Sequence, residues 1–435
     1  MKGSVSLPGD KSISHRAALF SALAEGETQI TNFASSEDCS STLRCLEDLG
    51  VVVVRNGSEV RIKGVGKNGL NPPANELDCG NSGTTVRLIA GILAGQDFDS
   101  VLTGDESLSK RPMRRIIEPL AQMNAEIDSN EFLLPMKIHG KNPLKAIRYI
   151  LPVASAQVKS CLLLAGLNAA GKTTVESPAA KTKTPNSRNH TELMLKFLGA
   201  DIREDFRETD DGFIHEVTID GGSKLSSRDL VIPSDISSAA FFMVAAACLK
   251  GSDVLLQNVG LNPTRAAIIT VLQRFGVKID ILNERVACGE IVGDLRVTGK
   301  GNFEYNAASH IIDGDIIANL IDEIPVLAVF GTQIEGGLEI RDAGELRVKE
   351  SDRISAVVEN LKRMGADVEE FPDGLRVGRS SLKGAAIDSF GDHRIAMAFA
   401  VAGLFAHGET EIMNSECAAI SFPEFFDTLA QTVIN

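Results

Sequence analysis

The feature that most constrains the fold of this 435-residue chain is a short segment, a helix end followed by a strand, that recurs along it. In each copy a glycine or asparagine ends a helix in the C-cap region, and a β-prone run follows at once. The copies begin at residues 49, 123, 198, 275 and 364, about 75 to 90 residues apart. A repeat of this length predicts a fold built from several similar supersecondary units.

A second recurring element lies about 25 residues upstream of each copy: an Ala/Leu-rich helix ends at a glycine turn and leads into a strand. Together the two elements define six units, each with the expected order strand, helix, strand, helix and strand pair. The helix entry at Ile232–Ala240 echoes the entry at Leu7–Ser14. Three units in each half therefore indicate two similar domains that meet near residue 232.

Composition is that of a soluble globular protein, with 43% apolar and 23% charged residues. The N-terminus lacks the basic and then apolar segments of a signal peptide, and no apolar run reaches about eighteen residues. We therefore expect a cytoplasmic protein without a membrane segment. The seven cysteines are scattered, which predicts reduced and mostly buried thiols. A net charge of −14 argues against nucleic-acid or membrane binding, so that any anion site must be a local cationic patch.

The first helix begins with positive charge, the sign that a helix start disfavours. Its first turns offer Lys11, His15 and Arg16, although a helix N-terminus already carries partial positive charge and unpaired N–H groups. A bound anion would explain this pattern. The alternative is that Lys11 and Arg16 point into solvent.

Residues 166–173 fit the G-x-x-x-x-G-K-[ST] phosphate loop of nucleotide hydrolases and kinases. That loop needs a strand before it and a helix after it. Here an apolar helix (158–167) comes first and a strand (173–178) follows, so we do not expect a nucleotide loop.

Other helix entries carry further cations and two carboxylates. Taken singly, Asp322 and Glu350 fit helix caps better than catalysts. If the repeats point their helix starts toward one cleft, the cations there would repel one another unless anionic substrates bind. These cations are Lys11, Arg16, Arg111, Arg188, Lys349, Arg353 and Arg394. Two carboxylates among them could exchange protons with a substrate, and we expect no metal, no cofactor and no covalent nucleophile.

Six motifs, in order along the whole chain, resemble those of the enolpyruvylshikimate-phosphate synthases, a family of enolpyruvyl transferases. They are Leu7–Arg16, Gly80–Arg87, Lys110–Met113, Ile321–Pro325, Arg347–Arg353 and Gly391–Arg394. The resemblance implies an α/β fold of two similar domains, each of three βαβαββ units (an inverse α/β barrel), with the active site in the interdomain cleft. Because the first strand would cross to the C-terminal half, the implied domains are 12–232 and 1–11 plus 233–435.

The resemblance also implies a reaction and its residues. The enolpyruvyl group of phosphoenolpyruvate would pass to the 5-hydroxyl of shikimate 3-phosphate through a tetrahedral intermediate, releasing phosphate, in aromatic amino-acid (chorismate) biosynthesis. Asp322 would be the base on that hydroxyl, Glu350 would handle the methylene proton and Lys11 would share proton transfer. The residues matched to shikimate 3-phosphate are Lys11, Ser12, Arg16, Ser155, Ala156, Gln157, Arg188, Asp322 and Lys349. Those matched to phosphoenolpyruvate are Lys11, Asn81, Gly83, Arg111, Gln157, Arg353 and Arg394. We expect these two small molecules as the only partners of a monomer.

Two positions depart from the best-known branch of that family. Ile420 stands where that branch has a lysine that contacts phosphoenolpyruvate, and Leu88 stands where it has proline. Gly83 is the residue associated with glyphosate-sensitive members, so we expect sensitivity to glyphosate.

The runner-up is the sister enolpyruvyl transferase that acts on UDP-N-acetylglucosamine. It has Lys-Asn where this chain has Lys11-Ser12, and a reactive cysteine in the loop that here spans 105–110. A nucleotide-dependent kinase and a noncatalytic solute-binding protein are the alternatives from other classes.

Overall fold

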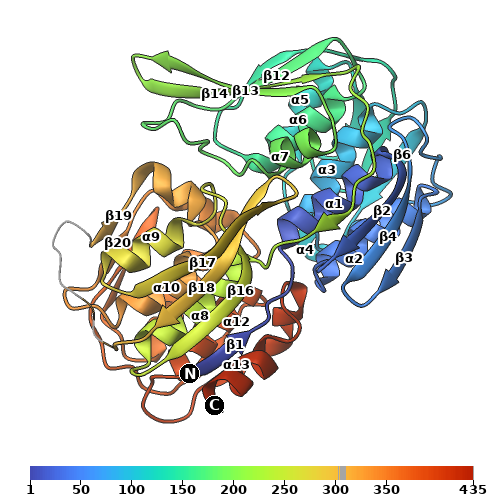
Figure 1. Ribbon diagram of the computed structural model, residues 1–435. Helices are drawn as coiled ribbons and strands as arrows, with labels where there is room; N and C mark the ends of the chain where they lie inside the picture. The colour runs from blue at the N-terminus through green and yellow to red at the C-terminus, as the bar shows by residue number, and fades with distance from the viewer. Residues whose placement is uncertain (302, 304–309, 435) are drawn as a thin grey trace. The chain divides into compact units, whose positions relative to one another are not determined.

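The computed structural model describes residues 1–301, 303 and 310–434. The chain divides into two compact units (Figure 1). Unit 1 comprises Met1–Pro8, Pro233–Val286 and Ile291–Asn435, and unit 2 comprises Gly9–Ile232 and Ala287–Glu290. Both are mixed α/β structures with small four-stranded sheets. Among the described residues, no helix has the length and apolar character needed to cross a membrane.

Unit 2 holds three four-stranded sheets that share one strand order. In order of neighbours they are β15 (Leu230–Val231), β2 (Glu25–Thr31), β4 (Glu59–Val65) and β3 (Val52–Asn56); β5 (Leu77–Asp78), β6 (Asp99–Thr103), β8 (Met136–His139) and β7 (Glu126–Ser129); and β10 (Arg148–Ile150), β12 (Lys172–Glu176), β14 (Gly212–Asp220) and β13 (Ile202–Thr209). A short pair, β9 (Leu144–Lys145) and β11 (Ala169–Ala170), adds to them. In each sheet the first pairing is parallel and the other two are antiparallel. The sheets therefore repeat one topology three times.

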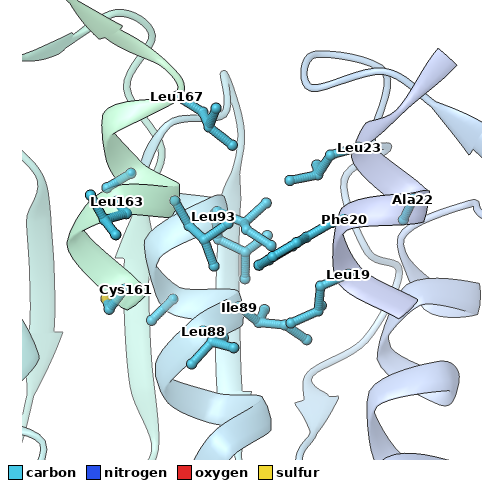
Figure 2. Packing of buried hydrophobic residues seen from close by; sticks show 14 of the residues in the cluster. Leu19, Phe20, Ala22, Leu23, Leu88, Ile89, Leu93, Cys161, Leu163 and Leu167 are labelled. Carbon is cyan, nitrogen blue, oxygen red and sulfur yellow. The ribbon is translucent and has the colours of Figure 1, made fainter. Parts of the chain in front are cut away.

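Three helices that are apolar on nearly every side lie at the centre of unit 2, as expected of helices buried all round. They are α1 (Lys11–Leu23), α3 (Gly83–Ala94) and α6 (Ala156–Gly166), and each packs against its own sheet. Phe20 of α1 lies near Leu93 of α3, and Leu163 of α6 lies on the other side of α3 (Figure 2). The remaining helices of the unit are α2 (Glu37–Asp48), α4 (Glu106–Ser109), α5 (Arg114–Gln122) and α7 (His190–Phe197).

Unit 1 repeats this plan with α8 (Ile236–Cys248), α10 (Ile324–Gly331) and α12 (His393–Gly403) as its buried helices. Its strands are β1 (Lys2–Val5), β16 (Asp253–Gly260), β18 (Glu290–Thr298) and β17 (Lys278–Ala287); β19 (Ile311–Ile312), β20 (Leu338–Ile340), β22 (Gly374–Val377) and β21 (Val368–Phe371); and the pair β23 (Ala386–Asp388) and β24 (Glu411–Met413). Its other helices are α9 (Ala267–Arg274), η2 (Gly314–Asn319), η3 (Gly344–Val348), α11 (Arg353–Arg363), η4 (Ser415–Ile420) and α13 (Phe425–Ile434).

Each unit contains one strand that pairs with a strand far from it in sequence. β1, at the start of the chain, pairs in parallel with β16 and so completes a sheet of unit 1. β15, which precedes the second half, pairs in parallel with β2 of unit 2. This is the strand crossover that the sequence resemblance implies.

The structure also confirms the order of elements around residues 166–173. Helix α6 ends at Gly166, the first residue of this segment, and strand β12 begins at Lys172. A phosphate loop would need the opposite order, because its N–H groups must point from a helix start.

Candidate active site

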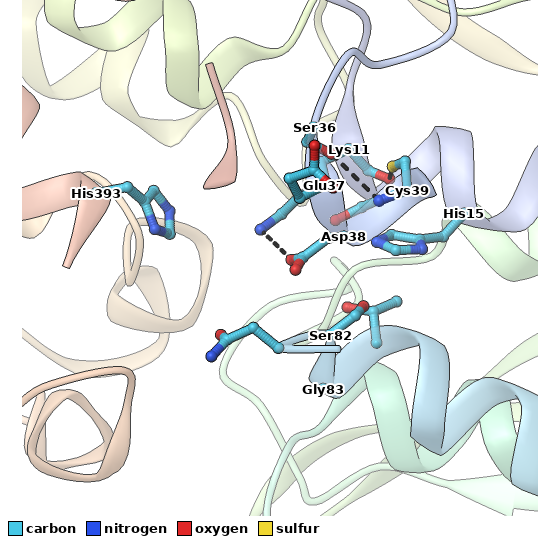
Figure 3. Close-up of polar contacts among 12 residues, drawn as sticks. Lys11, His15, Ser36, Glu37, Asp38, Cys39, Ser82, Gly83 and His393 are labelled. Carbon is cyan, nitrogen blue, oxygen red and sulfur yellow. Dashed lines mark hydrogen bonds and ion pairs between the residues drawn. The ribbon is translucent and has the colours of Figure 1, made fainter. Parts of the chain in front are cut away.

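The candidate residues fall into two groups, one in each unit, and each group is described by itself. In unit 2 the first group surrounds the start of α1. Asp10 caps this helix by accepting a hydrogen bond of 2.8 Å from the Ile13 amide. Lys11 follows at once, and its ammonium forms a 2.9 Å ion pair with Asp38 (Figure 3). The solvent alternative is wrong for Arg16, because its side chain is buried.

Arg16 is a buried cation whose hydrogen bonds all go to neutral groups. Its Nε donates to Thr191 Oγ1 at 2.7 Å, and its Nη2 donates to Ser160 Oγ at 2.8 Å. The third bond, from Nη1, goes to the Ser12 carbonyl at 2.8 Å. Burial lowers the pKa of Arg16 to about 10, so the group still carries its charge near neutral pH. A buried charge that only neutral groups hold is well suited to an anionic ligand.

Three further candidates lie at the start of α6. Ser155 caps this helix, and Ala156 is its first residue. The amide of Gln157 is tied to α3, because it accepts a 2.8 Å hydrogen bond from Arg87 and donates one of 3.1 Å to Thr84. Arg188, which precedes α7, donates to the Ser12 hydroxyl at 3.5 Å. The candidates matched to shikimate 3-phosphate in unit 2 are thereby linked to α1 and α3.

The start of α3 holds the other candidates of unit 2. Asn81 accepts a 3.2 Å hydrogen bond from Arg111 and donates one of 2.8 Å to Asp105. A Cβ atom on Gly83 would lie 2.7 Å from Arg87 Nη1, so that glycine leaves room for this guanidinium. Arg87 belongs to the Gly80–Arg87 motif, but we assigned it no role from the sequence. Its position one helical turn after Gly83 was the available signal.

In unit 1 the candidates surround Arg353, whose side chain is 2% exposed. Its guanidinium forms ion pairs with Asp392 at 2.8 Å, Glu350 at 2.6 Å and Asp322 at 3.3 Å. Arg394 joins this cluster through a 3.5 Å contact with Asp322. Burial alone would lower the pKa of Arg353, but the three carboxylates outweigh it and raise that pKa above its ordinary value.

Neither candidate carboxylate of unit 1 caps a helix, so the cap interpretation is wrong. Helix α11 is capped by Asp352, not by Glu350, and the residue at the N-cap of α10 is Glu323. Burial raises the pKa of Glu323, with Arg265 acting in the opposite direction. Asp322 and Glu350 instead share the Arg353 guanidinium, which holds the two carboxylates at one place.

Three positions singled out in the sequence lie outside this cluster. The Lys349 ammonium pairs with Glu345 at 2.9 Å and contacts none of the other candidates. Ile420 is the last residue of η4 and is half-buried. Leu88 is fully buried in α3, and thus belongs to the core of unit 2. Asp38 and Asp392, the ion-pair partners of Lys11 and Arg353, were not among the expected site residues.

One group in the described part of the chain has ligand atoms close enough together for a metal ion: Glu192, Glu204 and His215. The Lys159 ammonium already lies 2.5 Å from Glu192, and both side chains are buried. A lysine thus supplies the positive charge that a cation would bring.

Comparisons with known proteins agree on one family. Residues 1–429 match the family described as EPSP synthase (3-phosphoshikimate 1-carboxyvinyltransferase). A 3-phosphoshikimate 1-carboxyvinyltransferase of Solibacter usitatus is 50% identical over 98% of this chain and 96% of the relative. A 3-phosphoshikimate 1-carboxyvinyltransferase of Koribacter versatilis is 49% identical over 99% of this chain and 96% of the relative. The solved structure of EPSP synthase from Acinetobacter baumannii has a TM-score of 0.85 and 42% identity, over 99% of this chain and 95% of that one.

Proposed function

This chain belongs to the EPSP synthase family and is a 3-phosphoshikimate 1-carboxyvinyltransferase, and we propose that residues of both units form its active site. The activity implies that EPSP is formed from phosphoenolpyruvate and shikimate 3-phosphate. In this proposal the two domains are 12–232 and 1–11 plus 233–435, each an inverse α/β barrel of three βαβαββ units. The repeated sheet order supports this division.

The observation that carries the substrate assignment is the buried Arg16, whose hydrogen bonds within the described residues go to neutral groups. A phosphate dianion near it would replace part of the solvation that burial removes. We therefore assign the shikimate 3-phosphate site in unit 2 to the residues around the starts of α1, α6 and α7. They are Lys11, Ser12, Arg16, Ser155, Ala156, Gln157 and Arg188. Asp322 and Lys349 of unit 1 would complete this site.

Phosphoenolpyruvate would bind cations from both units. In unit 2 it would meet the start of α3, with Lys11 and Gln157 beside it. In unit 1 its anionic groups would bind the guanidinium groups of the Arg353 cluster. The assigned residues are Lys11, Asn81, Gly83, Arg111, Gln157, Arg353 and Arg394.

The two carboxylates on Arg353 give the reaction its proton steps in this proposal. Asp322 takes the proton of the 5-hydroxyl as its oxygen forms a bond to C2 of phosphoenolpyruvate, and the methylene carbon gains a proton. Elimination then breaks the C2–O bond to phosphate and removes a proton from the new methyl group, which restores the double bond. Glu350 handles the proton at this carbon, and Lys11 shares proton transfer with the departing phosphate.

One assay tests the reaction and its alternatives. Phosphate release from phosphoenolpyruvate is measured with shikimate 3-phosphate, with UDP-N-acetylglucosamine and with no acceptor, and then with ATP in place of phosphoenolpyruvate. We expect release only with phosphoenolpyruvate and shikimate 3-phosphate together. Release with the UDP-sugar would contradict the proposal.

The role of Asp322 is tested by Asp322→Ala. We expect turnover to fall on the order of a hundredfold, while substrate affinity is kept, because acid–base help is lost. The matched control is Glu369→Gln, which removes an exposed carboxylate paired with Arg376 at 3.2 Å. A loss of affinity with turnover intact would remove Asp322 from proton transfer.

Because the assigned cations belong to two units, the anions should draw the units together. We expect the radius of gyration from small-angle scattering to decrease when both substrates are bound. An unchanged scattering curve would contradict closure.

We also propose that glyphosate inhibits the enzyme. Gly83 leaves open the space beside Arg87 that an alanine methyl would take. Turnover that continues uninhibited in millimolar glyphosate would contradict this.

Finally, we propose a cytoplasmic monomer. Its seven cysteines are free thiols, which suits a reducing compartment. Sedimentation at several protein concentrations tests the monomer, and a stable dimer would refute it. Cell fractionation tests the location.

A further inference from the structure

A chain of buried side chains joins the first helix of unit 2 to the start of α3. His15 Nδ1 lies 2.7 Å from Thr42 Oγ1, which lies 2.7 Å from Thr85 Oγ1. Thr85 in turn donates to Ser82 Oγ at 2.7 Å. All four side chains are fully buried. The His15 ring and Ser82 lie close to the starts of α1 and α3 in Figure 3.

The donor and acceptor in each of these hydrogen bonds follow from counting the protons of the hydroxyl groups. A hydroxyl has one proton to donate, and Thr85 uses its proton on Ser82. Thr85 must then accept from Thr42, which leaves Thr42 with no proton for His15. The hydrogen between His15 and Thr42 therefore belongs to His15 Nδ1.

The other ring nitrogen supports this assignment. Burial lowers the pKa of His15 to about 3, with Asp38 opposing the shift and Lys11 adding to it, so the ring is neutral near pH 7. A neutral ring protonated at Nδ1 has a bare lone pair at Nε2. Nε2 is buried and has no hydrogen-bond partner in the described part of the chain. The contact at Nδ1 is thus the hydrogen bond that the ring makes among the described residues.

We propose that His15 is a positioning residue that acts through Thr42 and Thr85 on Ser82 and so fixes the start of α3 relative to Lys11. Ser82 is the N-cap of α3, where it accepts a 3.1 Å hydrogen bond from the Thr85 amide. Asn81 and Gly83 flank this cap, and Lys11 lies one turn before His15 on α1. The inference rests on the proposed function, which assigns Lys11, Asn81 and Gly83 to phosphoenolpyruvate.

The first experiment measures the His15 tautomer in the wild-type enzyme by ¹⁵N NMR at pH 7. We expect Nδ1–H with an unprotonated Nε2. The opposite tautomer would overturn the inference. This readout needs no turnover, so it stays separate from a failure of the proposed reaction, which the phosphate-release assay reveals first.

The second experiment removes one hydroxyl without changing side-chain shape. In Thr42→Val we expect the KM for phosphoenolpyruvate to rise about three- to tenfold, the effect of one buried hydrogen bond, with the KM for shikimate 3-phosphate unchanged. The matched control is Thr28→Val in β2, whose buried hydroxyl has no hydrogen-bond partner in the structure. Equal kinetics in the two variants would overturn the inference.

Two substitutions of His15 test which ring nitrogen donates the hydrogen bond. The side-chain amide of His15→Asn can place an N–H group near the position of Nδ1, whereas that of His15→Gln places it near Nε2. We expect His15→Asn to keep the wild-type KM for phosphoenolpyruvate and His15→Gln to behave like Thr42→Val. Equal behaviour of both variants would show that Nδ1 does not position α3.

Discussion

The substitution Asp392→Asn separates the charge of a buried carboxylate from its role as a helix cap. Asp392 is fully buried at the N-cap of α12, where its Oδ1 accepts a 2.9 Å hydrogen bond from the Arg394 amide. Its Oδ2 accepts from Arg353 at 2.8 Å and from Ser351 at 3.1 Å. Asparagine keeps the capping oxygen, removes the charge and replaces Oδ2 with an amide nitrogen, which cannot accept the hydrogen bonds from Arg353 and Ser351.

The expected loss in the free energy of unfolding depends on the carboxylates that remain around Arg353. Removing one partner of a buried ion pair costs about 3–5 kcal/mol when the other charge is left alone. Arg353 keeps Glu350 and Asp322, so we expect the smaller loss of one charge-assisted hydrogen bond, about 2–3 kcal/mol in the free energy of unfolding. Asp392→Ala should cost about 1 kcal/mol more, because it also removes the cap.

The same carboxylate predicts a pH dependence. Burial alone would raise the pKa of Asp392, but Arg353 outweighs it and leaves that pKa below its ordinary value of 3.8. A carboxylate with a lowered pKa in the folded state contributes stability above its unfolded pKa and loses it as the pH falls. The stability difference between wild type and Asp392→Asn should therefore shrink below about pH 4.

Urea unfolding followed by circular dichroism at pH 7 measures this difference. The control is Asp352→Asn, which changes another N-cap carboxylate of unit 1, paired with Arg347 at 2.9 Å but 38% exposed. We expect the control to cost less than about 1 kcal/mol, as exposed ion pairs do. Equal losses in Asp392→Asn and Asp352→Asn would refute the reasoning from burial.

Three other predictions concern unit 2. Lys159→Met leaves the buried Glu192 without its ion-pair partner, so the free energy of unfolding should fall by about 3–5 kcal/mol, and the double variant with Glu192→Leu should recover much of the loss in urea unfolding. Gly9→Ala should lower the melting temperature, because its Cβ would lie 1.8 Å from the Asn32 carbonyl oxygen; an unchanged melting temperature would contradict this close approach. Burial raises the pKa of the Cys39 thiol to about 12, so this thiol should react with Ellman's reagent at pH 8 only after unfolding.

The fold was accessible from sequence where it depends on local signals. Helix ends with a glycine or asparagine recur about every 75 to 90 residues, and this spacing predicts a repeated supersecondary unit, in agreement with the several small four-stranded sheets. The reversed order of helix and strand around Gly166 likewise excluded a phosphate loop, as α6 and β12 confirm.

The ion-pair partners of the charged candidates could not be predicted from such local sequence signals. Asp38 and Asp392 look like ordinary helix-start residues in the sequence, and both do lie near helix starts. Their pairing with Lys11 and Arg353 joins segments that only the tertiary fold brings together. For the same reason, Asp322 and Glu350 taken singly fit helix caps in the sequence, whereas the tertiary fold brings both to one guanidinium.

The pairing of β1 with β16 and of β15 with β2 has a consequence for synthesis on the ribosome. β1 leaves the ribosome before unit 2, but its partner β16 is made only after nearly all of unit 2. Unit 2 gains its own edge strand β15 earlier, so this unit can assemble while the N-terminal segment waits unpaired. Of the four residues of β1, only Val5 is buried in the finished sheet. An unpaired strand with a single side chain that is buried in the folded protein exposes little apolar surface to other nascent chains. Late pairing of β1 therefore carries little risk of aggregation.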